Sequence, residues 1–301
     1  MKKYFPIAMT LLIALAAQTA RAELKVLACE PEWGALVQEL AGDKASVYLA
    51  TTGLQDPHHI QARPSLVAAA RGSDLLVCTG AELEVGWLPV LIRQSGNNAI
   101  QPGKPGNFET ANYVRKLEVP DRLDRADGDV HAAGNPHIQT DPRNIALVAE
   151  PLARRLAELD PANAAVYQAR NADFMLRWKA AIQRWEKEAA PLHGTPVVVQ
   201  HKAFPYLQQW LGLVEVAVLE PKPGVEPTSS HLSAVLAGLQ TRPAKMILRA
   251  AYNDGRGAEW LAERTKLPIV VLPFTVGGDE QAKDLFSLFD DTVQRLLKAA
   301  P

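Results

Sequence analysis

The residues best suited to chemistry are two histidines that each follow a proline. An Asp-Pro-His sequence ends at His58 and an Asn-Pro-His sequence ends at His137. Proline fixes its own φ and keeps the residue before it out of the α region, so each tripeptide predicts a rigid turn that aims an imidazole. Neutral histidine is the commonest metal-binding side chain. The pair therefore predicts a metal site, with two histidines capping surface helices as the alternative.

Two further residues can complete a ligand set. His201 follows a strand-like run at residues 197–200 and opens a helical pattern, as His58 also does. Asp279 stands in a loop after residues 269–272, directly behind two glycines that let the backbone turn freely. Either residue alone is better explained as a capping or solvated side chain, and only the joint pattern reverses that preference. Three imidazoles and one carboxylate together form a tetrahedral set suited to zinc.

Composition limits the class of protein. The chain has 301 residues, of which 48% are hydrophobic, and a formal net charge of −1. This is a globular composition, long enough for two domains with their own cores. A near-zero net charge argues against nucleic acid as a partner, because phosphate binding calls for a basic face.

The first 22 residues predict a secretory signal peptide. Lys2 and Lys3 precede an apolar run at residues 7–17, and a small-x-small cleavage pattern ends at Ala22. The apolar run is too short for a spanning helix, although a retained anchor is the alternative. No cysteine follows this segment directly, so we expect no lipid anchor. We expect an exported, periplasmic protein.

The chain has two cysteines, Cys29 and Cys78, and each closes a short apolar run that predicts a buried strand. An exported protein meets an oxidising compartment, which permits a disulfide. If the two strands are neighbours, their ends bring the sulfur atoms within bridging reach. We expect a disulfide, with two buried free thiols as the alternative. A thiolate metal site is less favoured, because CxxC spacing is absent.

Strand-like and helical runs alternate along the chain, which predicts parallel sheets with helices on both faces. Ligands of such sheets bind beyond the carboxyl ends of the strands, where His58 is expected. An irregular loop at residues 101–133 contains a single histidine, His131, so it is no histidine-rich metal-gathering tract. The predicted helices include residues 33–40, 82–92 and 144–159. The predicted strands are residues 24–28, 45–50, 75–77, 196–200, 214–219, 245–249 and 269–272.

A continuous helical pattern at residues 160–190 separates the two halves. At about 1.5 Å per residue it spans roughly 45 Å, which is longer than one domain needs. We interpret it as a rigid connector between two α/β lobes, with a core helix of one large domain as the alternative. The expected organisation is a signal peptide at residues 1–22, an N-terminal lobe at 23–159, the connecting helix at 160–190 and a C-terminal lobe at 191–301.

Several motifs in order give the chain a family resemblance. It resembles the metal-specific solute-binding proteins of ABC importers for zinc and manganese, from about Leu24 to Leu297. The motifs are Asp-Pro-His ending at His58 with Pro64-Ser65, Gly-Asn-Pro-His ending at His137 with Asp141-Pro142, His201-Lys202-Ala203-Phe204-Pro205-Tyr206, and Leu219-Glu220-Pro221-Lys222-Pro223-Gly224 through Thr228-Ser229-Ser230.

The resemblance implies two α/β lobes joined by one long helix, with the metal in the cleft between them. By position it implies the ligands His58, His137, His201 and Asp279, the last with Glu280 and Asp284 nearby. His59 is the alternative to His58 if the turn differs.

The resemblance also bears on the choice of metal. Manganese members of the family tend to carry a carboxylate where this chain has His201. Imidazole suits zinc, whereas carboxylate-rich sets suit manganese. Glu30 and Glu82 follow strands near the same cleft and are candidates for partners that fix a histidine tautomer, although solvated caps are the favoured interpretation.

These patterns predict a monomeric binding protein that captures Zn²⁺ and hands it to the membrane permease of an ABC importer. A manganese-binding protein of the same type is the first alternative. A zinc hydrolase is less favoured, because four protein ligands close the position that catalytic zinc keeps open for water. Neither an HExxH nor a GxSxG motif is present. A structural module whose metal only stabilises the fold would not divide its ligands between two lobes.

Overall fold

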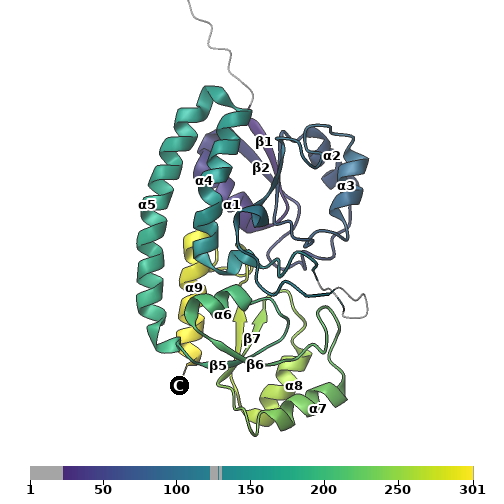
Figure 1. Ribbon diagram of the computed structural model, residues 1–301, viewed down its shortest axis with the longest axis vertical. Coiled ribbons are helices and arrows are strands. Elements are labelled where there is room, and N and C mark those ends of the chain that lie inside the picture. Colours follow the sequence, from purple (N-terminus) through teal and green to yellow (C-terminus); the bar gives the residue numbers. More distant parts are fainter. Residues whose placement is uncertain (1–22, 123–127, 129–130, 301) are drawn as a thin grey trace, which may run out of the picture.

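The computed structural model describes residues 23–122, 128 and 131–300, and it contains two parallel four-stranded sheets (Figure 1). The first sheet has the order β2-β1-β3-β4 and the second has the order β6-β5-β7-β8. The strands of the first sheet are β1 (Leu24–Ala28), β2 (Ala45–Leu49), β3 (Leu75–Cys78) and β4 (Asn107–Glu109). Those of the second are β5 (Pro196–Val199), β6 (Val214–Val218), β7 (Met246–Ala250) and β8 (Ile269–Leu272). This confirms the predicted fold class.

Helices cover both faces of each sheet. Along β1, Val26 and Ala28 pack into a core with α1 and α4, whereas Leu27 faces α2 and α3 on the other side. Such strands are apolar on both faces and therefore appear in the sequence as short continuous hydrophobic runs. The helices are α1 (Pro31–Ala41), α2 (Pro64–Gly72), α3 (Leu88–Ser95), α4 (Pro142–Leu159), α5 (Ala164–Ala189), α6 (Pro205–Leu211), α7 (Ser229–Gly238), α8 (Arg256–Thr265) and α9 (Leu285–Ala299).

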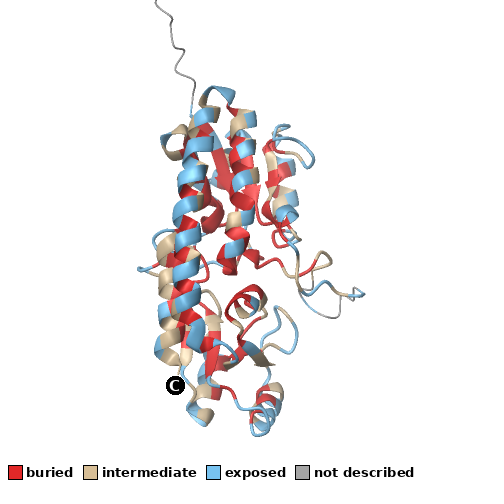
Figure 2. Ribbon diagram, turned by 60° about the vertical axis from the view of Figure 1, so that its left-hand side comes forward, coloured by how far each residue is buried: buried red, intermediate tan, exposed pale blue. Residues whose placement is uncertain are grey.

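Helix α5 runs along both lobes and joins them (Figure 1). It packs against α1 and α4 of the first lobe and α9 of the second. Its buried face carries Phe174, Trp178 and Trp185, while Figure 2 shows exposed residues along its outer face. These rings belong to one hydrophobic core that continues from the first sheet into the second. The predicted connecting helix is confirmed, and the shared core makes it a rigid spine.

The two cysteines form the expected disulfide. Strands β1 and β3 are parallel neighbours with Ala28 opposite Val77, so Cys29 and Cys78 follow at adjacent strand ends. Their Cα atoms are 4.8 Å apart and the sulfur atoms are bonded. Because both sulfurs are used in this bond, they cannot serve as metal-binding thiolates. The disulfide ties the ends of two strands beside the interlobe region.

One predicted helix is wrong in its first half. Residues 82–87 form turns, and helix α3 begins only at Leu88. Ala81 and Glu82 have φ values of 51° and 67°, which lie outside helical geometry. The Glu84 carboxylate accepts the backbone N–H groups of Thr79 and Gly80, so it holds the turn instead of joining a helix.

The predicted signal peptide lies outside the described residues. In the part of the chain that the structure describes, no helix is both long and apolar enough to cross a bilayer.

Candidate metal centre

Three histidines from distant parts of the chain meet between the lobes. One nitrogen from each of His58, His137 and His201 lies within 4.8 Å of the other two, and all three residues are buried. Their ring centroids are 5.3, 5.5 and 5.8 Å apart. Zinc–nitrogen bonds of about 2.0–2.1 Å in tetrahedral directions place ligand nitrogens roughly 3.3 Å apart. The three rings are therefore close to a zinc-binding arrangement and need only a small contraction.

Each histidine follows from the architecture of its lobe. His58 lies in the loop after β2, and His201 lies two residues beyond the end of β5. His137 directly precedes the 3₁₀ turn Ile138–Thr140 that leads into α4. Ligand sites of parallel sheets lie beyond the carboxyl ends of the strands. Two such ends face one another here, so the first lobe supplies two imidazoles and the second supplies one.

Both proline-containing turns have the same hydrogen bond at their base. The side-chain Oδ1 of Asp56 accepts the backbone N–H of His58 at 3.0 Å. The Oδ1 of Asn135 accepts the backbone N–H of His137, also at 3.0 Å. These are Asx turns, in which a short polar side chain replaces a backbone carbonyl two residues before the donor. They explain why an aspartate or asparagine precedes each proline.

Carboxylates fix the tautomer of two of the rings. The Nδ1 of His58 lies 2.7 Å from Asp56 Oδ1, and the Nδ1 of His201 lies 2.7 Å from Glu220 Oε2. Each carboxylate accepts the Nδ1–H, which leaves the Nε2 lone pair for a metal. Burial alone would raise the pKa of the Asp56 carboxyl, but its hydrogen bonds to His58 hold the pKa below the usual value. Asp56 is therefore a charged acceptor at neutral pH.

The unsatisfied atoms of the site suit a cation. His58 Nε2 and His137 Nδ1 are buried and have no hydrogen-bond partner among the described residues. Burial, followed by the nearby charges of His58, His201 and His131, lowers the pKa of His137 well below its usual value. Its imidazole is therefore neutral at pH 7 with a lone pair available. Orphaned buried nitrogens are costly unless a ligand uses them, so the residues present fit a metal ion.

Asp279 does not join this group. Its Oδ1 accepts the backbone N–H groups of Gln281 and Ala282, and its Oδ2 forms an ion pair with Arg295 of α9. The loop after β8 thus uses the carboxylate to fix its own turn and to dock on a helix. In this structure Asp279 therefore lies outside the group of three imidazoles, and its role as a metal ligand stays a prediction.

The tautomer-fixing partners are also different from those considered in the sequence. Glu30 is buried, and its Oε2 accepts the hydroxyl and backbone N–H of Thr79. Glu82 is exposed and accepts the backbone N–H of Ala132. Neither contacts a ligand ring through these bonds, and Asp56 and Glu220 take that role.

His59 is exposed, and its ring centroid is 6.1 Å from that of His58. Of these two neighbours, His58 is the one that joins His137 and His201.

An aromatic support was not foreseen from the sequence. The ring of Phe274 packs edge-on against His137, with centroids 5.4 Å apart, and Tyr252 packs on Phe274 at 5.2 Å. Phe274 has a φ of 70°, which is unusual for a bulky residue and marks a backbone held by its surroundings. Burial raises the pKa of Tyr252 well above its usual value, and the charges of Asp56 and Glu220 add to this effect. Phe274, backed by Tyr252, therefore forms an aromatic support for the His137 ring.

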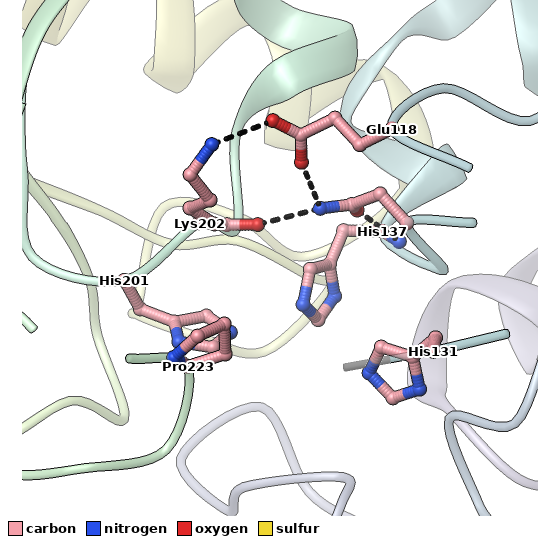
Figure 3. A pocket seen from close by; sticks show the side chains of 7 residues that line it. Glu118, His131, His137, His201, Lys202 and Pro223 are labelled. Atoms are coloured by element: carbon pink, nitrogen blue, oxygen red, sulfur yellow. Dashed lines mark hydrogen bonds and ion pairs between the residues drawn. The ribbon is translucent and has the colours of Figure 1, made fainter. Parts of the chain in front are cut away.

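A cavity of about 170 Å³ opens onto the site (Figure 3). In that view the rings of His131, His137 and His201 all border it, and Glu118 bonds with Lys202 at its rim. The lining residues are Glu118, His131, Asn135, His137, His201, Lys202 and Pro223. The cavity therefore gives an ion access to two of the three clustered imidazoles.

Known proteins with related sequences cover nearly the whole chain. The family described as "Zinc-uptake complex component A periplasmic" matches residues 26–299. The metal ABC transporter substrate-binding lipoprotein ScbA of Streptococcus cristatus is 22% identical over 289 residues, covering 94% of this chain and 90% of that protein. The manganese ABC transporter substrate-binding lipoprotein PsaA of Streptococcus mitis is 23% identical over 288 residues, covering 92% and 88%.

Solved structures share the fold. The crystal structure of ZnuA superposes with a TM-score of 0.75 at 21% identity, covering 93% of this chain and all of that one. A zinc-bound deletion mutant of ZnuA gives a TM-score of 0.74 at 23% identity, covering 92% and 98%. The Mn-bound periplasmic metal binding protein from Candidatus Liberibacter asiaticus gives 0.73 at 18%, covering 92% and 99%.

Proposed function

Because the chain belongs to the family of periplasmic components A of zinc-uptake complexes, we propose that it captures Zn²⁺ in the periplasm and delivers it to an ABC permease. Substrate-binding proteins of metal ABC transporters bind a metal ion and work with a membrane permease. The chain is such a binding protein and not an enzyme.

The observation that carries the proposal is the convergence of three buried imidazoles. His58, His137 and His201 form the proposed protein ligand set, with Asp56 and Glu220 holding two of the rings in the metal-binding tautomer. Because Asp56 and Glu220 already hold these rings in position, metal binding costs little side-chain conformational entropy. His58 Nε2 and His137 Nδ1, which have no hydrogen-bond partner in the part of the chain that the structure describes, leave lone pairs for a metal.

Zinc is favoured over manganese by ligand chemistry. Imidazole nitrogen suits zinc, whereas manganese favours carboxylate, carbonyl and water oxygens. The three clustered residues are all histidines and offer nitrogen donors. The carboxylate predicted to join them, Asp279, forms an ion pair with Arg295 instead. A site of this composition predicts that Zn²⁺ outcompetes Mn²⁺.

Manganese is the second candidate, because the relatives named PsaA are manganese-transporter proteins. The Mn-bound structure of similar fold supports the same alternative. Both candidate functions use the same site, and they differ in which of the two ions binds more tightly.

Release of the ion would follow from the division of ligands between lobes. The first lobe holds His58 and His137, and the second holds His201. A small displacement of the loops of one lobe separates the set, although both lobes share the core along α5. The shared core favours a limited shift over a wide hinge opening.

The test is competition between Zn²⁺ and Mn²⁺ for the purified mature chain, followed with a chelating dye. We expect one Zn²⁺ per chain and at least 100-fold weaker binding of Mn²⁺, given the ligand preferences above (an order-of-magnitude figure). His58→Ala, His137→Ala and His201→Ala each remove a proposed direct ligand. Each should weaken Zn²⁺ binding by about 100-fold or more, because removing a residue that only hydrogen-bonds to a metal ligand already costs up to about 100-fold.

The matched control is His193→Ala, which removes an exposed histidine after the 3₁₀ turn Ala190–Leu192. It should bind Zn²⁺ as the unmodified chain does. Unchanged affinity in all three ligand variants would place the site elsewhere. A preference for Mn²⁺ would support the second candidate.

A further inference from the structure

The three clustered histidines leave a tetrahedral ion one ligand short. Structural zinc sites are four-coordinate, with nitrogen, sulfur or carboxylate donors. The fourth residue expected from the sequence, Asp279, is engaged by Arg295 and two backbone N–H groups. A fourth donor must therefore come from another residue or from water.

The residues that line the cavity beside the site limit the candidates for the fourth metal ligand. Among its lining side chains, Glu118 accepts bonds from Lys202 Nζ and Asn135 Nδ2, one on each carboxylate oxygen. The Oδ1 of Asn135 also accepts the backbone N–H of His137. These three side chains thus form a network with one another at the rim. His131, which borders the same cavity, has the side chain best suited to zinc.

His131 already contacts a ligand ring. Its ring stacks on that of His58 with centroids 5.4 Å apart and planes 27° apart. This separation falls within the 5.3–5.8 Å range of the three clustered rings. His131 is not among the residues whose nitrogens all lie within 4.8 Å of one another, so it lies beside the cluster and not within it.

The backbone around His131 holds the ring near the cleft. The His131 carbonyl accepts the backbone N–H of Gly134, and the N–H of Ala132 binds Glu82 of the first lobe. Gly134 has a φ of 99°, which permits the tight turn back toward His137. A second cavity, lined by His58, His59 and Glu82 among others, also borders His131. His131 therefore borders two cavities while it stacks on His58.

From this geometry we infer that His131 supplies the fourth ligand when the ion binds, moving from its stack on His58 onto the metal. The inference rests on the proposed function, since it concerns the same site. It gives an all-imidazole shell, which strengthens the preference for zinc over manganese. It also makes the turn at residues 131–134 respond to whether the site is loaded.

Cobalt(II) provides the test, because tetrahedral Co²⁺ absorbs strongly in the visible and a cysteine thiolate on Co²⁺ adds a charge-transfer band in the near ultraviolet. The chain's two cysteines, Cys29 and Cys78, are joined in a disulfide and give no such band. His131→Cys should therefore create this band on cobalt loading. His59→Cys, on an exposed neighbour of His58, is the matched control and should not.

A second measurement uses affinity and ligand count. X-ray absorption of the zinc-loaded chain should fit four imidazoles, and His131→Ala should fit three. His131→Ala should weaken Zn²⁺ binding by about tenfold or more, because removing a residue that only hydrogen-bonds to a metal ligand already costs about tenfold. Asp279→Asn should retain the affinity and the four-imidazole fit.

The outcomes separate the two proposals. Tetrahedral cobalt in His131→Cys without the thiolate band, or three imidazoles in the unmodified chain, would overturn the role of His131 alone. A loss of affinity in Asp279→Asn with none in His131→Ala would do the same. Failure of the unmodified chain to bind Zn²⁺ or Co²⁺ would overturn the proposed function itself.

Discussion

The turns that end at His58 and His137 share a backbone design but hold their imidazoles differently. Both use an Asx side chain to accept the histidine N–H at 3.0 Å. In the first turn Asp56 also accepts Nδ1–H of the ring it positions. In the second turn Asn135 gives its Nδ2 hydrogens to Glu118 and to the backbone oxygen of Lys202 in the other lobe.

This difference separates two tasks that one motif can perform. The carboxylate of the first turn adjusts the ligand, because it fixes the tautomer and makes the ring a better donor. The amide of the second turn joins the lobes, because it can donate where a carboxylate cannot. Burial, followed by the nearby charges of other histidines, lowers the pKa of His137 and keeps its ring neutral. Each substitution below should affect one task and leave the other.

Asp56→Asn should have the largest effect, since it gives the first turn the chemistry of the second. The amide oxygen can still accept the His58 N–H, as Asn135 does for His137, so the fold should persist. Losing the charged partner should weaken Zn²⁺ binding by about 10–100-fold, or about 1.4–2.8 kcal/mol. Dye competition measures this change. An unaltered affinity would contradict the role assigned to Asp56.

The reverse substitution, Asn135→Asp, is the matched counterpart. It removes two donated hydrogen bonds and places a carboxylate against Glu118. We expect the metal-free chain to lose about 1–3 kcal/mol of stability in urea unfolding. Its Zn²⁺ affinity should fall less than that of Asp56→Asn. The opposite ranking would show that the two turns do not divide the tasks in this way.

The buried neutral ring of His137 predicts a pH-dependent stability of the metal-free chain. Its pKa is lowered in the folded state, so the unfolded chain binds a proton first as the pH falls through about 6.5. The contribution of His137 is therefore present above that pH and is lost below it, with a slope of at most about 1.4 kcal/mol per pH unit.

The stability difference between the unmodified chain and His137→Ala isolates this effect. Glu32 and Glu84 have pKa values raised to about 7 by burial, which works in the opposite sense over the same range. Because both variants retain these glutamates, their contribution cancels in the difference. Urea unfolding between pH 5 and pH 8 should show the unmodified chain losing stability relative to His137→Ala as the pH falls. A constant difference would mean that His137 is not held neutral.

Tyr206→Phe should have the smallest effect and act on the second turn only. The Tyr206 hydroxyl donates to the Asn135 carbonyl at 2.7 Å and accepts the N–H of Leu117 at 3.0 Å. Removing the hydroxyl should cost about 0.5–1.5 kcal/mol in urea unfolding, the net contribution of a typical hydrogen bond. Tyr113→Phe, which alters an exposed tyrosine, is the control and should change little. A cost no larger than that of the control would show that this tie to the second lobe is weak.

Much of the architecture could be predicted from the sequence because its signals are local. Strands buried on both faces appear as short apolar runs, and the proline in each turn identified His58 and His137. The position of His201 followed from the rule that ligands lie beyond strand ends. The helix expected over residues 82–92 failed in its first half because Glu84 binds backbone N–H groups instead of extending it.

The rest of the site depends on contacts between distant residues. A carboxylate after a strand suits a metal ligand or an arginine partner equally, and only the fold places Arg295 of α9 beside Asp279. In the same way, Glu220 becomes the partner of His201 because β6 lies next to β5. Local sequence gives the type of donor, whereas the packing of the lobes decides which donors meet.

The most direct test is an anomalous difference map collected at the zinc absorption edge from crystals of the zinc-loaded chain. The proposed three-histidine site predicts one dominant peak about 2.0–2.1 Å from a ring nitrogen of each of His58, His137 and His201. A peak elsewhere, or no peak between these three rings, would contradict it.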